Sequence, residues 1–208
     1  MTLLSPSIPL LILLTFTQLV ACHHQKSHQA QTSLVSKPQR TTLLPKNSQL
    51  LTQSGTAKVG EMMPFFSGWS ISKNAGQAYS LQKALSHKKQ RYVLNICASW
   101  CAPCRVGLKR LSEAKTLFGD RKIELIILIA DQSQSAQRLS ARFDLSWAYT
   151  IVDEFNTFAL KFASELPSSN RGSESLSLPR TIVFNGEGLI TQIIGTEGED
   201  YIKQLTKP

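Results

Sequence analysis

Two apolar runs, residues 91–98 and 123–130, constrain the fold of this 208-residue chain more than any other feature. Both are rich in β-branched residues and show no polar alternation, as expected for strands buried on both faces of a sheet. Between them, residues 104–118 carry apolar side chains at helical spacing, and Gly119 with Asp120 marks the end of that helix. A strand, a helix and a parallel strand form a βαβ unit, whose crossover is expected to be right-handed.

The pattern after this unit predicts an α/β fold whose central sheet ends in an antiparallel hairpin. In a helix over 154–163 we expect Phe155, Phe158 and Phe162 to face the core. The other expected elements are a helix over 133–143, a strand over 148–153, hairpin strands over 180–184 and 189–194, and a final helix over 197–206. Asn185 and Gly186 suit a tight hairpin turn with positive φ.

Positive charge gathers between the N-terminus and this pattern. The chain has a formal net charge of +9 and 42% hydrophobic residues, which is enough for a real core. The segment 22–60 has no acidic residue and contains Lys26, Lys37, Arg40, Lys46 and Lys58. Because no aromatic residues are interleaved with this charge, we expect no nucleic-acid partner, and an anionic membrane surface is the better match.

Composition divides the chain into three parts. Residues 22–58 are polar, contain two prolines and show no sustained period, which predicts a flexible tether that cannot fold alone. The folded domain is expected over 59–208. Three histidines near the start of the tether are interpreted as solvated linker residues rather than metal ligands: His23, His24 and His28.

The first 21 residues are predicted to be a signal peptide. Their apolar run from Ile8 to Ala21 is about 14 residues long, whereas a membrane-spanning helix needs roughly 20. The run ends in Leu-Val-Ala-Cys, which resembles the lipobox of bacterial lipoproteins and implies lipidation of Cys22. An ordinary signal peptide or a short anchor with an incidental cysteine stays open, because no Lys or Arg precedes the run. Either interpretation places the domain in the bacterial cell envelope, on the periplasmic side; outer and inner membrane both stay open.

Three cysteines lie within eight positions, at 97, 101 and 104. This spacing occurs at iron–sulfur clusters, but Cys97 belongs to a predicted buried strand. A structural zinc site needs a fourth ligand, and neither His nor Cys follows Cys104 anywhere in the chain. We therefore expect no metal and no cofactor, and we interpret Cys97 as a buried apolar residue, with a modulatory role left open.

The stretch Cys101-Ala102-Pro103-Cys104 sits where a buried strand ends and a helix begins. A helix N-terminus stabilises a thiolate and lowers a cysteine pKa from about 8.5 to roughly 3.5–7.5. Pro103 fits the first helical turn because it has no N–H to leave unpaired. Cys101 is thus a candidate nucleophile, and the more covered Cys104 can resolve a mixed disulfide.

The sequence "VLNICASWCAPCR" resembles the "NFWASWCxPCR" signature of TlpA-like and ResA-like proteins, the exported branch of the thioredoxin superfamily. Further resemblance lies in an N-terminal strand over 59–66, in residues 79–85, and in the hairpin 178–190; it covers about 59–206 in all. The resemblance implies a thioredoxin fold, with a central mixed β-sheet flanked by helices and an N-terminal strand extension. It also implies a lipoprotein-type thiol–disulfide oxidoreductase.

The resemblance assigns three supporting residues. Pro179 is implied to be a cis-proline beside the disulfide, with the bulky Leu178 before it; an ordinary trans proline is the alternative. Trp100 is implied to shield one side of the site, and a core aromatic is the alternative.

The chain also departs from the family. Gly107 and Lys109 stand where relatives often have a glutamate and a proline, which leaves the proton route of Cys104 open. Asn95 takes the place of an aspartate of cytosolic thioredoxins. The segment 164–177 is longer and more polar than expected, and suits either partner selection or a passive insertion.

These features predict an enzyme that reduces disulfides of exported proteins and receives electrons from a membrane thiol-relay protein. The alternative function is a copper-handling lipoprotein, since soft thiolates favour Cu(I). Peroxidase chemistry is less favoured because no separate Thr-x-x-Cys pattern is present.

Overall fold

The structure is a computed structural model that describes residues 51–52, 57–163, 176–195 and 197–207. The predicted signal peptide, Cys22 and nearly all of the tether lie outside the described residues, as does most of the segment 164–177. The folded part belongs to one compact unit, residues 41–208.

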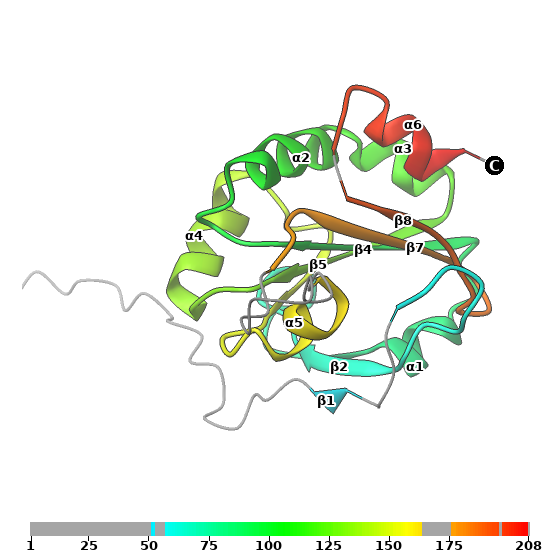
Figure 1. Cartoon of the computed structure of the whole chain (residues 1–208), viewed down its shortest axis with the longest axis horizontal. Coiled ribbons are helices and arrows are strands. Elements are labelled where there is room, and N and C mark those ends of the chain that lie inside the picture. The colour runs from blue at the N-terminus through cyan, green and yellow to red at the C-terminus, as the bar shows by residue number, and fades with distance from the viewer. Residues whose placement is uncertain (1–50, 53–56, 164–175, 196, 208) are drawn as a thin grey trace, which may run out of the picture. The chain divides into compact units, whose positions relative to one another are not determined.

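A five-stranded mixed sheet with the order β6-β5-β4-β7-β8 forms the centre of the domain (Figure 1). Its parallel strands are β4 (Arg91–Cys97), β5 (Ile123–Ile129) and β6 (Tyr149–Val152). The antiparallel hairpin adds β7 (Arg180–Asn185) beside β4, and then β8 (Ile190–Ile194). The predicted α/β architecture and its βαβ unit are confirmed.

Helices cover both faces of this sheet (Figure 1). One face packs against α2 (Ala102–Glu113), α3 (Lys115–Asp120), α4 (Ser133–Arg142) and α6 (Tyr201–Thr206). The other face packs against α1 (Leu81–Leu85) and α5 (Thr157–Ala163). Residues of β4 alternate between the two cores, with Val93 on the first side and Leu94 on the second. A strand covered on both faces needs an apolar run without alternation, as β4 has.

A small antiparallel sheet precedes the central one. Its strands show that the N-terminal strand predicted over 59–66 was placed too early in the chain. It contains β1 (Leu51–Thr52), β2 (Phe66–Trp69) and β3 (Ala78–Ser80). Only the last residue of the expected strand 59–66 is part of β2. The preceding chain turns at Gly60, whose φ is +86°, and Pro64 has no N–H for a sheet ladder.

The predicted helix over 104–118 is two helices that meet at Ala114, whose φ of −88° and ψ of 8° depart from α-helical values. The final helix begins at Tyr201 instead of 197, so Glu197 lies in the loop before it. In the hairpin turn, the positive φ occurs at Gly188 and not at Asn185 or Gly186.

The expectation that Phe155 faces the core is wrong, because this residue is 73% exposed and precedes α5. The carboxylate of Asp153 accepts hydrogen bonds from the backbone N–H groups of residues 157, 158 and 159 at 2.8–3.0 Å. This cap starts the helix at Thr157, three residues later than predicted. Phe158 and Phe162 are buried, as expected.

Phe158 and Phe155 form a matched pair for testing this packing. The ring of Phe158 is fully enclosed and lies 4.8 Å from the ring of Phe66 and 4.1 Å from that of Phe162, centroid to centroid. Phe158→Ala is expected to lower the free energy of unfolding by about 3–5 kcal/mol. Phe155→Ala is expected to change it by less than about 0.5 kcal/mol. Urea unfolding of both variants measures the difference, and equal losses would contradict the observed helix start.

Candidate active site

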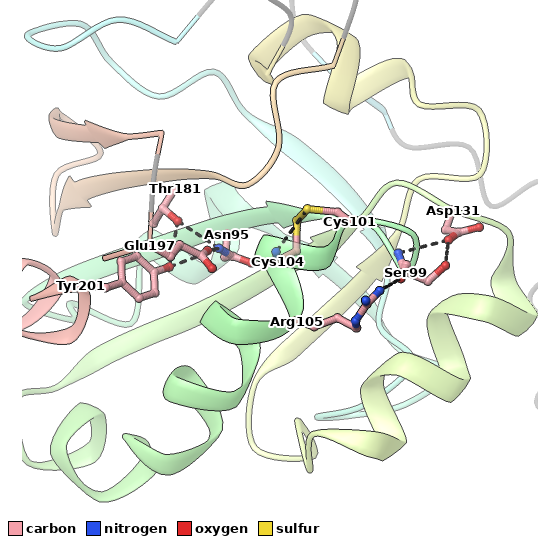
Figure 2. Close-up of a disulfide and its surroundings, with 9 residues drawn as sticks. All are labelled: Asn95, Ser99, Cys101, Cys104, Arg105, Asp131, Thr181, Glu197 and Tyr201. Carbon is pink, nitrogen blue, oxygen red and sulfur yellow. Dashed lines mark hydrogen bonds between the residues drawn. A yellow bond between two sulfur atoms is a disulfide. The ribbon is translucent and has the colours of Figure 1, made fainter. Parts of the chain in front are cut away.

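The cysteine pair lies at the start of α2, directly after the central strand (Figure 2). Cys101 is the N-cap residue of α2, and its sulfur accepts a hydrogen bond from the backbone N–H of Cys104 at 3.2 Å. Pro103 occupies the first turn, where a missing N–H leaves nothing unpaired. Cys101 and Cys104 form a disulfide with 5.3 Å between their Cα atoms. Cys101 is 4% exposed and Cys104 is fully enclosed, so attack from outside is directed to Cys101.

The loop before Cys101 is held by a polar contact that sequence reasoning missed. Ser99 donates hydrogen bonds from its backbone N–H and its hydroxyl to the carboxylate of Asp131. Arg105 donates from Nη1 to the carbonyl oxygen of Ser99 at 3.0 Å. Asp131 lies two residues after the end of β5, and the carboxyl ends of parallel strands meet at one edge of a sheet. The sequence signal that could have predicted this contact is the position of Asp131, which comes immediately after the apolar run 123–130.

Leu178 and Pro179 also lie at this edge. The peptide bond between them is cis, which is the conformation the family resemblance implies. They directly precede β7, whose first residue Arg180 is paired in register with Ile96 near the end of β4. Leu178 is half-buried and packs against the apolar cluster that contains Cys101 and Cys104.

Trp100 is 62% exposed, which excludes the interpretation of this residue as a core aromatic. Its shielding role stays a prediction.

Cys97 is the third cysteine of the motif and stays a free thiol, fully buried in β4. Burial raises its pKa far above the usual value, and the nearby carboxyl groups of Glu197 and Asp131 raise it further. This thiol therefore stays protonated near neutral pH and packs as an apolar residue.

A buried polar cluster lies on the other side of Cys104 (Figure 2). The side-chain amide of Asn95 donates to Thr181 Oγ1 at 3.0 Å, to Glu197 Oε1 at 2.6 Å and is 3.2 Å from the Tyr201 hydroxyl. Thr181 and Tyr201 are themselves joined at 2.8 Å. The four side chains come from β4, β7, α6 and the loop after β8. Of these, sequence reasoning singled out only Asn95, because the others lack any local motif.

Glu197 is the titratable member of this cluster. Burial raises its pKa from 4.5 to about 7, although hydrogen bonds from Asn95 and Tyr201 and the nearby Arg110 favour the charged form. A carboxyl group with such a pKa exchanges protons near neutral pH.

Metal ligands do not gather in the described part of the chain: no three His, Cys, Asp or Glu side chains there could hold an ion together. The tether histidines and Cys22 lie outside the described residues.

Residues 58–203 match the Redoxin family. The chain belongs to this family. With the Cys101–Cys104 pair at the start of its helix, this redoxin is a thiol–disulfide oxidoreductase. No curated protein matches the chain.

Solved structures agree on the fold. The thioredoxin domain of a thiol-disulfide oxidoreductase from Bacteroides vulgatus is 15% identical, with a TM-score of 0.53 over 73% of this chain and 99% of that one. A thioredoxin-family thiol:disulfide interchange protein from Chlorobium tepidum is 18% identical, with a TM-score of 0.54 over 73% and 97%. The peroxidoxin BcpB from Mycobacterium tuberculosis is 14% identical, with a TM-score of 0.56 over 72% and 94%. The predicted thioredoxin fold is confirmed.

Substitution of each cysteine separates their roles. Cys101→Ser is expected to abolish exchange with a model disulfide, because the accessible sulfur is lost. Cys104→Ser is expected to accumulate a mixed disulfide on Cys101, visible as added mass in the intact protein. Cys97→Ala is the control and is expected to exchange like wild type. Exchange at the wild-type rate by Cys101→Ser would contradict this assignment.

Proposed function

We propose that this redoxin is exported, is held at a membrane by lipid on Cys22, and reduces disulfides of envelope proteins. The observation that carries the proposed exchange is the Cys101–Cys104 disulfide at the start of α2, in which Cys101 retains 4% exposure and Cys104 has none.

The difference in exposure between the two cysteines supports an ordered exchange. In the reduced enzyme, the Cys101 thiolate attacks a substrate disulfide, forms a mixed disulfide and releases the first substrate thiol. Cys104 then loses its proton and attacks the Cys101 sulfur, which closes the enzyme disulfide and releases the second substrate thiol. Two electrons pass from the enzyme dithiol to the substrate. The dithiol is restored by a membrane thiol-relay protein, which is the proposed partner.

The surroundings of Cys101 favour the reducing direction. A strongly oxidising pair has a highly stabilised reduced form. Among the described residues, only the backbone N–H of Cys104 donates a hydrogen bond to the Cys101 sulfur. The guanidinium of Arg105 donates to the carbonyl oxygen of Ser99 instead.

Export and tethering are proposed from the first 58 residues. The short apolar run ending at Cys22 fits a cleaved leader, and the basic, acid-free tether fits an anionic membrane surface. No helix in the described part of the chain is long and apolar enough to cross a membrane.

The reduction potential of the Cys101–Cys104 pair tests the direction of exchange. The full-length protein is equilibrated in redox buffers, alkylated and weighed by mass spectrometry. We expect a value near that of thioredoxin, about −270 mV, because a single backbone N–H, that of Cys104, donates to the Cys101 sulfur among the described residues. A value near −120 mV would make the protein an oxidant. A pair that never forms a titratable disulfide would instead favour copper binding.

Lipidation is tested by expressing the full chain in bacteria fed labelled palmitate. The wild-type protein is expected to incorporate the label and to sediment with membranes. Cys22→Ser is expected to do neither, because the proposed acceptor sulfur is gone. The control is Cys97→Ala, which keeps Cys22 and is expected to be labelled like wild type. Equal labelling of the Cys22→Ser protein would contradict the assignment of this residue.

A further inference from the structure

A carboxylate from the C-terminal loop occupies the position where a side chain on α2 would lie. A Cβ atom placed on Gly107 would be 1.3 Å from Oε2 and 2.0 Å from Cδ of Glu197. Gly107 follows Cys104 by three residues on the same helix, and such pairs share a face with about 5–6 Å between Cβ positions. The glycine therefore makes room for Glu197 next to Cys104.

The two oxygens of this carboxylate have different surroundings. Oε1 accepts the hydrogen bond from Asn95, whereas Oε2 is enclosed by protein and has no hydrogen-bond partner among the described residues. Oε2 is also the oxygen directed at Gly107. An enclosed oxygen without a donor is costly, and it has a free site for a proton.

The loop that carries Glu197 is attached to the same helix. Arg110, one turn beyond Gly107, donates from Nη1 to the carbonyl oxygens of Glu197 and Gly198. The main chain of Glu197 and of the residue after it is therefore held against α2.

The groups that face the carboxyl group come from every element around it. The group from α2 is Arg110, those from β4 are Asn95 and Cys97, and Thr181 and Tyr201 come from β7 and α6. Arg110 is the one cation among them, and it donates hydrogen bonds to main-chain oxygens. The resulting pKa of about 7 suits a group that takes up and returns protons near neutral pH.

We propose that the Glu197 carboxylate is the proton acceptor for the Cys104 thiol. During the second step, Oε2 of Glu197 takes the proton of the Cys104 thiol while the Cys104 sulfur attacks the Cys101 sulfur. The Cys101–Cys104 bond forms, the bond from Cys101 to the substrate breaks, and the substrate leaves as a thiolate. The Glu197 carboxylic acid then returns the proton to the leaving thiolate or to water. The inference rests on exchange through Cys101 and Cys104, but on neither export nor the direction of exchange.

The test separates the two steps of exchange. Reduced full-length protein with Cys22→Ser is mixed in a stopped-flow instrument with excess dithionitrobenzoate, an aromatic disulfide whose thiolate absorbs light. This background leaves Cys101, Cys104 and the buried Cys97 as its thiols, and it serves as the wild-type reference for all variants. Attack by Cys101 releases the first thiolate, and closure by Cys104 releases the second. The rate of the second release is measured between about pH 5.5 and 9, a range that spans both the carboxyl and the thiol ionisation.

Glu197→Gln keeps the shape of the side chain and an oxygen for Asn95 but cannot accept the proton. We expect its second release near pH 7 to be at least about tenfold slower than in wild type, since general bases contribute roughly 10²–10⁴-fold. The two rates are expected to converge above about pH 9, where the thiol ionises unaided. The first release is expected to be unchanged.

Two further variants keep the test decisive. Glu199→Gln removes an exposed acid from the same loop and is expected to match wild type. Gly107→Ala displaces the carboxylate and is expected to show the pH profile of Glu197→Gln. A Glu197→Gln protein with the wild-type profile would overturn the proposal. Absence of any thiolate release by the wild-type protein would instead refute exchange at Cys101.

Discussion

The pairing of β4 with β5 on one side and β7 on the other organises the whole site. Parallel pairing with β5 places Asp131 at the same sheet edge as the loop after β4. Antiparallel pairing with β7 brings the cis Leu178–Pro179 bond to that edge as well. From Tyr92 to Cys97 β4 is buried, so the cysteine loop begins at the end of a strand packed on both faces. Sheet registry thus brings together the segments that surround the reactive pair, and local hydrogen bonds then hold its loop.

The second constraint is the volume shared by Gly107 and Glu197. Burial lifts the folded-state pKa of Glu197 to about 7, above the 4.5 of the free group. Its contribution to stability is therefore fully present below about pH 4.5 and is lost as the pH rises through 7. A carboxylate kept where its ionisation weakens the fold is typical of a functional group. The proposed proton transfer from the Cys104 thiol gives a reason for the buried carboxylate of Glu197.

Local patterns predicted the elements whose neighbours are close in sequence. The unbroken runs at 91–98 and 123–130 identified the central strands, and the Cys-Ala-Pro-Cys stretch identified a reactive pair at a helix start. The predicted helix boundaries were wrong where a side chain outside the predicted helix determined its first residue. Asp153 caps α5 three residues late and leaves Phe155 outside the core. Phe155 fits the helical period, so periodicity alone could not exclude it.

By itself, the sequence determined the fold class, the buried strands and the reactive role of the two cysteines. Each of these depends on patterns of residues that are close together along the chain. Only the tertiary structure decided what surrounds Cys104. Glu197 is 93 positions away from Cys104 along the chain. It lies near the pair because β8 runs back to the sheet edge at which β4 ends. The sequence showed that Gly107 stands where relatives often have a glutamate. It did not show that Glu197 lies at that place in the fold. Proximity through space, not spacing along the chain, sets the dielectric surroundings and hydrogen bonds that tune a proton acceptor.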